Sequence, residues 1–263
     1  MRYFIYLSYK GTNYHGWQMQ ANARTVQGEV NRALSLLLNE KIETTGAGRT
    51  DTGVHASYFV AHFDSGQYEL YVAANGTAQT LYKLNCILPG DICIHDILHV
   101  EATAHARFDA VQRTYKYYIS TEKNPFNTEF AAFFPFELNV AAMNDAAQLL
   151  FEYTDFTSFA KLHGQSKTNR CRIIQARWEA TAGGLEFTIS ADRFLRNMVR
   201  AIVGTLIDVG RGKITRDDLR HIITRKNRCA AGSSVPAKGL WLTGIQYKNA
   251  PNISRGIDLP VII

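Results

Sequence analysis

The chain contains little cysteine, and none of it is arranged as metal sites or disulfide frameworks require. Its 263 residues include four scattered cysteines, Cys86, Cys93, Cys171 and Cys229. Zinc ribbons and disulfide scaffolds need closely and regularly spaced cysteines, so the sequence argues against both. His95 and His99 are four residues apart, as metal ligands on a helix can be, but residues 91–100 alternate like a strand. We therefore expect no metal.

Long apolar runs are also missing. No stretch approaches the roughly 20 apolar residues that a membrane-spanning helix needs. Lys10 and Gly11 interrupt the short apolar run at residues 3–7, so nothing near the amino terminus resembles a signal peptide. The length suffices for one or two domains with a real hydrophobic core. We expect a globular, cytoplasmic protein.

The glycine-rich segment 46–56 lacks the residues that nucleotide-binding loops need. A dinucleotide fingerprint that starts at Gly46 and Gly48 requires a third small residue, where this chain has Asp51. A phosphate-binding loop counted from Gly48 reaches Gly53 correctly, but Val and His then replace the required Lys and Ser or Thr. We expect no nucleotide cofactor.

What this segment does contain is a single carboxylate, Asp51, between Gly48 and Gly53, with Arg49 two positions earlier. Flanking glycines let the backbone turn sharply, so the short acidic side chain can stand at the tip of a loop, as nucleophiles often do. An aspartate in such a loop is more commonly a turn former whose carboxylate bonds its own backbone. On these residues alone both interpretations stay open.

Positive charge is concentrated in one part of the chain. The whole sequence has a net charge of +6, whereas residues 193–228 hold ten basic and three acidic residues, a net charge of +7. Such a concentration is typical of proteins that bind a polyanion such as nucleic acid. The alternative is an ordinary solvated helix face.

Hydrophobic periodicity predicts two similar α+β halves. In the first half we expect strands at 3–8, 58–63 and 91–100, a helix that Thr25 caps, and a helical stretch at 70–84 that Gly76 weakens. In the second half we expect strands at 114–120, 174–181, 185–190 and 240–247, and helices at 140–151, at 194–209 and after the capping box 215–218. Gly183 and Gly184 are expected to form the turn of a hairpin.

This pattern predicts three parts. They are an amino-terminal α/β subdomain at 1–105 with the loop 46–56, a carboxy-terminal α/β subdomain at 106–248 with the basic helices, and an extended tail at 249–263. Two α+β units of this kind can leave a cleft between them.

Two further patterns could serve RNA recognition. On the helix expected at 194–209, the spacing of Arg193, Arg196 and Arg200 places them along one side, although an ordinary amphipathic helix looks the same. Strand alternation at 113–118 puts Tyr115 and Tyr117 on one face. Such a tyrosine can stack on a nucleobase, or it can simply pack in a sheet.

A set of motifs, in order along nearly the whole chain, connects these patterns. They are Tyr9-Lys-Gly-Thr-Asn-Tyr-His-Gly-Trp-Gln18, Thr25-Val-Gln27, Gly48-Arg-Thr-Asp-Thr-Gly-Val-His-Ala56, Leu84-Asn-Cys-Ile-Leu-Pro89, His105-Ala-Arg-Phe-Asp-Ala110 with Arg113-Thr-Tyr115, Asp155-Phe-Thr-Ser-Phe159, Phe194-Leu-Arg-Asn-Met-Val-Arg200 and Pro236-Ala-Lys-Gly-Leu240. In these motifs the chain resembles the tRNA pseudouridine(38–40) synthase family, also called tRNA pseudouridine synthase A.

The resemblance implies a fold, an activity and a site. The fold is α+β, with two ferredoxin-like or RRM-like subdomains whose largely antiparallel sheets meet at a central active-site cleft. The activity is isomerisation of uridine to pseudouridine at positions 38–40 of the tRNA anticodon stem-loop, by a homodimer without a cofactor. The implied residues are Asp51 as nucleophile, Arg200 as its charge partner, Arg49 in base flipping and Tyr115 stacked on the target uracil.

Phosphate contacts in this scheme are expected from Arg193, Arg196, Arg211 and Lys213. Two residues depart from the family pattern: Thr52 stands where alanine is more frequent, and Arg193 where a small or neutral residue is usual. Neither replaces a proposed chemical group.

Two other classes of function compete with an RNA isomerase. A tRNA-binding or folding module would keep the basic surface without the chemistry, and Asp51, Tyr115 and Arg200 argue against it. An aspartate-dependent phosphotransferase or hydrolase would need an Asp-x-Asp arrangement, but Gly53 occupies the second position.

Overall fold

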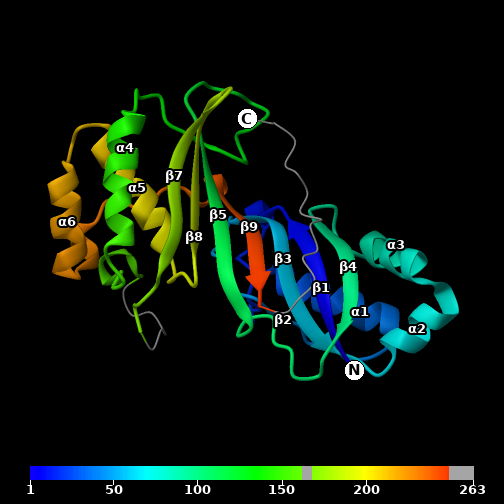
Figure 1. Ribbon diagram of the computed structural model, residues 1–263. Helices are drawn as coiled ribbons and strands as arrows, with labels where there is room; N and C mark the ends of the chain where they lie inside the picture. Colours follow the sequence, from blue (N-terminus) through cyan, green and yellow to red (C-terminus); the bar gives the residue numbers. More distant parts are fainter. Residues whose placement is uncertain (162–167, 249–263) are drawn as a thin grey trace. The chain divides into compact units, whose positions relative to one another are not determined.

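A computed structural model describes residues 1–161 and 168–248 of the chain (Figure 1). The chain forms two compact units. Unit 1 contains Met1–Val111 and the strand residues from Leu242 onward, and unit 2 contains Gln112–Trp241. The tail predicted at 249–263 lies outside the described residues. The predicted division at residue 105 stays a prediction.

In unit 1 the main strands are hydrogen-bonded in the order β4-β1-β3-β9, and β1 is antiparallel to both β3 and β4. The strands are β1 (Arg2–Tyr9), β3 (His55–Asp64), β4 (Ile92–Val100) and β9 (Leu240–Tyr247), and the short β2 (Thr45–Gly46) pairs with β3. Every residue of β1 from Tyr3 to Tyr9 is buried, which explains why this run is almost continuously apolar. Its register against β3 shifts between Leu7 and Tyr9, next to the loop that carries Asp51.

The helices of unit 1 are α1 (Val26–Leu38), α2 (Tyr68–Asn75) and α3 (Thr77–Ile87), with a 3₁₀ turn at Gly11–Asn13. The predicted cap of α1 is confirmed, since the Thr25 side chain accepts a hydrogen bond from the amide of Gly28. The stretch predicted at 70–84 is helical but is not one helix. Gly76, which was expected to weaken it, adopts a φ of +83° and separates α2 from α3.

In unit 2 the main strands are hydrogen-bonded in the order β5-β8-β7, and both of these pairs are antiparallel. Its strands are β5 (Ala110–Ser120), β7 (Ile173–Thr181) and β8 (Gly184–Ala191), and β6 (Ala132–Phe133) pairs in parallel with β5. The hairpin between β7 and β8 is confirmed, with Thr181 opposite Gly184. The turn therefore falls on Ala182 and Gly183, and Gly184 already belongs to the strand.

Three helices complete unit 2: α4 (Val140–Ala147), α5 (Met198–Gly210) and α6 (Arg216–Arg225). Helix α4 packs against β7, α5 and α6 (Figure 1). Short 3₁₀ turns lie at Gln148–Phe151, Thr157–Phe159, Arg228–Ala230 and Ala237–Gly239. The capping box of α6 is confirmed, because Thr215 and Asp218 exchange side-chain and backbone hydrogen bonds.

The start of α5 differs from the prediction in a way that matters for the arginines. Asn197 adopts left-handed backbone angles (φ +66°, ψ 0°), so the helix begins at Met198 instead of Phe194. Arg193 and Arg196 therefore lie in the connection between β8 and α5, and Arg200 is in the first turn of the helix. The predicted row of three arginines on one helix is wrong.

The fold class is confirmed as mixed α/β with largely antiparallel strand pairing, and the described residues contain nine strands and six α-helices. The core of unit 1 includes Trp17 stacked on Phe59 with a ring separation of 4.1 Å, and that of unit 2 includes Trp178 beside Phe187 at 4.7 Å. No helix among the described residues is long and apolar enough to cross a membrane.

Candidate active site

The loop that connects β2 to β3 carries Asp51 and Arg49. Asp51 is half-buried, and Arg49 is exposed. The amide of Val54 donates to the Asp51 carbonyl at 3.1 Å, and Gly53 has a φ of +78°. Thr52 keeps a negative φ, so residues 51–54 form a turn of type II, whose third position requires glycine. Asp51 thus opens a tight turn, and this backbone role is compatible with a chemical role for its carboxylate.

Both sides of this loop are fastened to the segment 9–18. The carbonyl of Thr50 accepts a hydrogen bond from the Trp17 amide at 3.3 Å, and the Gly53 amide donates to the Tyr14 carbonyl at 3.3 Å. Gly16 makes this approach feasible, because it has a φ of +86° and a Cβ there would lie 2.3 Å from the Thr50 oxygen. The motif at 9–18 therefore acts as the support of the loop that carries Asp51.

Tyr115 lies on β5 opposite Ile189 of β8 and is half-buried. The ring of Phe194, in the connection before α5, meets the Tyr115 ring edge-on, with centroids 5.2 Å apart. Two residues further on, Tyr117 is fully buried, and its phenol donates to the Pro236 carbonyl at 3.0 Å. Burial raises the pKa of Tyr117, and the positive charge of Arg200 opposes this shift. Tyr115 is thus the more accessible of the two.

Arg200 is held at the amino-terminal turn of α5 by a neighbouring segment. Its Nε donates to the Val235 carbonyl at 2.7 Å, and the Val235 amide donates back to the Arg200 carbonyl at 3.2 Å. Arg228 supports the same segment, because its guanidinium donates to the Gly232 carbonyl at 3.2 Å and to Ser234 Oγ at 2.9 Å. Arg228 therefore supports the backbone beside Arg200.

The predicted site residues come from both units. Asp51 and Arg49 share one loop of unit 1. The remainder belong to unit 2: Tyr115, Arg193, Arg196, Arg200, Arg211 and Lys213. The roles inferred for these side chains stay predictions. The supporting roles of Trp17 and Arg228 were not predicted from the sequence, although Trp17 belongs to the motif at 9–18.

The basic segment 193–228 is less positive in three dimensions than its sequence indicates. Several of its side chains form ion pairs: Lys213 with Asp208 (3.4 Å), Arg216 with Asp145 (3.4 Å), Arg220 with Glu152 (3.0 Å) and Lys226 with Asp155 (3.0 Å). Three of the four acidic partners lie far earlier in the sequence. Arg211 remains exposed, with its guanidinium over the Phe136 ring at 4.1 Å.

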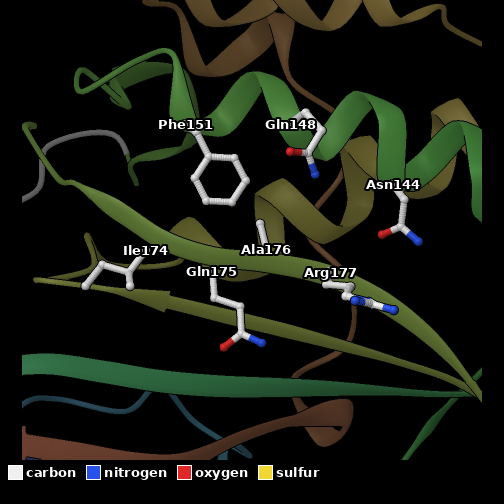
Figure 2. Close-up of a pocket in the computed structure, with 7 residues that line it drawn as sticks. All are labelled: Asn144, Gln148, Phe151, Ile174, Gln175, Ala176 and Arg177. Carbon is white, nitrogen blue, oxygen red and sulfur yellow. The ribbon is translucent and has the colours of Figure 1, made fainter.

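Two other features of the structure carry no predicted site residue. A shallow pocket lies between α4 and β7, lined by residues such as Phe151, Ile174 and Arg177 (Figure 2). His95 belongs to β4, and its Nε2 lies 2.8 Å from Ser8 Oγ. Within the described residues, no group of three or more His, Cys, Asp or Glu side chains could hold a metal ion.

Comparison with known proteins connects this geometry with a family. Residues 146–248 match a family model described as tRNA pseudouridine synthase. A tRNA pseudouridine synthase A of Parabacteroides distasonis is 51% identical over 248 residues, which are 94% of this chain and 96% of that protein. The chain belongs to the tRNA pseudouridine synthase A family. It is therefore an enzyme, an isomerase of the pseudouridine synthase class.

Other relatives extend the same match. The tRNA pseudouridine synthase A of Bacteroides fragilis is 52% identical over 247 residues, 94% of this chain and 96% of that protein. The Bacillus subtilis protein of the same name is 41% identical over 255 residues, 95% of this chain and 100% of that protein. The similarity therefore spans both units of this pseudouridine synthase.

Proposed function

We propose that this synthase converts uridine to pseudouridine at positions 38–40 of the tRNA anticodon stem-loop, with Asp51 as the nucleophile. The observation that carries the proposal is the loop of unit 1. It presents one half-buried carboxylate at the first position of a glycine-dependent turn, and backbone hydrogen bonds fasten both sides of that turn. A catalytic group on so firmly held a backbone can act without large rearrangement.

The reaction breaks the bond between uracil N1 and ribose C1′, turns the base and forms a bond between C5 and C1′. The proton on C5 leaves to solvent and N1 takes up a proton from solvent, so no oxidant or reductant is consumed. Carboxylates are ionised at neutral pH and need no neighbouring base to act as nucleophiles. In this proposal Asp51 attacks ribose C1′ or uracil C6, or it promotes elimination to a glycal.

The target uridine must leave its stack before any carboxylate can reach it, and unstacking costs a few kcal/mol. We assign the compensating contacts to three residues. The exposed Arg49 helps to hold the nucleotide out of the stack, and the half-buried Tyr115 stacks on the uracil. Arg200 pairs with the Asp51 carboxylate. The hydrogen bond from its Nε to the Val235 carbonyl restricts the guanidinium to few orientations, which supports this role.

The remaining contacts of the proposal concern the RNA backbone and the assembly. Phosphates are bound by Arg193, Arg196, Arg211 and Lys213, of which Arg196, Arg211 and Lys213 are exposed. Lys213 shares its charge with Asp208, so it contributes less than Arg211 does. The enzyme acts as a homodimer in the cytoplasm, as the family resemblance implies.

The test uses unmodified tRNA with tritium at uridine C5. The wild-type enzyme releases tritium as pseudouridine forms, and sequencing of the product maps the modified positions. Asp51→Ala and Asp51→Asn should bind the tRNA with unchanged affinity and release no tritium. Release that persists in both variants would refute the nucleophile. A wild-type protein that binds tRNA but releases tritium from none would support the alternative, a non-catalytic tRNA-binding module.

A further inference from the structure

Tyr9 and Thr50 form a buried pair directly beside the proposed nucleophile. The Tyr9 phenol and Thr50 Oγ1 lie 2.8 Å apart, a hydrogen bond in which either oxygen can donate. Tyr9 is 3% exposed and Thr50 is 7% exposed, so water does not readily replace either partner. The Tyr9 ring packs against Trp17 and Phe59, with centroids 6.2 Å and 5.6 Å away. The phenol is therefore held in one place.

Thr50 stands between Arg49 and Asp51, and it is held through both its backbone and its side chain. Its carbonyl accepts from the Trp17 amide, and its hydroxyl meets Tyr9. Each residue has only two soft backbone dihedrals, so fixing Thr50 also fixes where the Asp51 side chain begins. The next attachment along the loop is the Gly53 amide. Asp51 is therefore displayed between two fastened points.

We propose that Tyr9 is a positioning residue for Asp51 and acts through Thr50. The inference rests on the proposed function, in which Asp51 is the nucleophile. Displacement of a reacting group by about 1 Å can cost on the order of 100-fold in rate. A hydrogen bond between hydroxyls is directional, whereas apolar packing alone defines the orientation of the Thr50 side chain less sharply. Loss of the pair should therefore slow the chemical step and leave tRNA affinity unchanged.

Two substitutions separate positioning from stability. Tyr9→Phe leaves the Thr50 hydroxyl buried without its Tyr9 partner, and Thr50→Val leaves the Tyr9 phenol buried without its Thr50 partner. Each single variant should therefore have a lower free energy of unfolding than wild type. The double variant Tyr9→Phe/Thr50→Val removes both polar groups and should regain stability relative to the single variants. It does not regain the directional bond, so its catalytic rate should stay low.

The experiment measures single-turnover tritium release at saturating enzyme, the Kd for tRNA and the urea midpoint for all three variants. We expect the rate of Tyr9→Phe to fall about 10- to 100-fold, with Kd within about twofold of wild type. The double variant should have a rate as low as Tyr9→Phe despite its recovered urea midpoint. A rate that recovers together with stability, or a wild-type rate in Tyr9→Phe, would overturn the inference.

Tyr6→Phe is the matched control, because Tyr6 is a buried tyrosine of the same strand and pairs with Val60 and Asp96 away from the loop. It should keep the wild-type rate. Asp51→Ala distinguishes the two ways to fail. If Asp51→Ala still converts uridine, the proposed nucleophile is wrong. If Asp51→Ala is inactive and Tyr9→Phe is fully active, only the positioning inference is wrong.

Discussion

The loop 46–56 of unit 1 and the segment 228–236 of unit 2 support the two charged groups of the proposed site in different ways. The first holds Asp51 through buried neutral hydrogen bonds and a backbone approach that only Gly16 permits. The second holds Arg200 through the Val235 backbone and the charged fork of the half-buried Arg228. Buried neutral contacts tolerate almost no change, whereas a partly exposed charged fork can be replaced in part by water.

The largest effect should come from a methyl group at the closest approach in unit 1. Gly16→Ala combines a φ of +86° with a Cβ 2.3 Å from the Thr50 carbonyl oxygen, so we expect the free energy of unfolding to fall by about 2 to 4 kcal/mol. Urea denaturation measures this loss. Gly90→Ala is the control, because its Cβ would meet nothing within 4 Å. Equal losses of unfolding free energy in the two variants would contradict a close approach of Gly16 to the Thr50 carbonyl.

Removal of the Arg228 guanidinium in unit 2 should lower the free energy of unfolding by less than Gly16→Ala does. Arg228→Ala deletes donors to Ala231, Gly232 and Ser234, and we expect a loss of about 1 to 3 kcal/mol together with a lower single-turnover rate. The salt dependence of tRNA binding should not change, since this guanidinium binds protein oxygens. Arg228→Lys should recover only part of the loss, because an ammonium cannot reproduce the planar fork. A flatter salt dependence would instead assign Arg228 to the phosphates.

A smaller loss of stability should distinguish the hydroxyl groups of Thr50 and Ser234, one from each support. Ser234 Oγ accepts from Arg228 and from Asn197 Nδ2 (2.6 Å) but is half-buried, whereas the hydroxyl of Thr50 is buried. Ser234→Ala should therefore cost about 1 kcal/mol or less, and less than Thr50→Val. The urea midpoints of the two variants give the comparison directly. A larger loss from Ser234→Ala would reverse it.

The smallest expected effect on stability comes from Arg211, which belongs to neither of the two supports. Arg211 lies exposed over Phe136, so Arg211→Ala should leave stability nearly unchanged and reduce the slope of log K against log salt for tRNA binding by about one. Arg220→Ala is the matched control, because Glu152 already pairs with that guanidinium. Equal slopes in the two variants would mean that ion pairing does not decide which arginines meet phosphate.

Local patterns predicted most of the elements because helices and strands depend on neighbouring residues. The cap at Thr25, the capping box at 215–218 and the strand Leu240–Tyr247 were all anticipated from short segments. The start of α5 was not. The Lys161 amide donates to the Arg196 carbonyl, and this contact across 35 residues helps to keep the segment before Met198 out of the helix.

The candidate site likewise contains features that the sequence predicted and features that it did not. The ordered motifs identified Asp51, Arg49, Tyr115 and Arg200 as candidate site residues, because chemistry constrains residue type as well as spacing. They could not predict that Tyr9 meets Thr50 or that Arg228 supports the segment beside Arg200. Hydrogen bonds of this kind join residues that are distant in sequence, so the hydrophobic periodicity of a short segment does not predict them.

The sequence by itself determined the α+β class, the order of nearly all elements, the family and the single carboxylate between glycines. The tertiary structure decided which basic side chains pair with acids, which arginines leave the helix, and how the segment 9–18 fastens the loop that carries Asp51. The reason is physical. Backbone conformation and apolar periodicity are local properties, whereas charge pairing, burial and close approach arise only when distant parts of the chain come together.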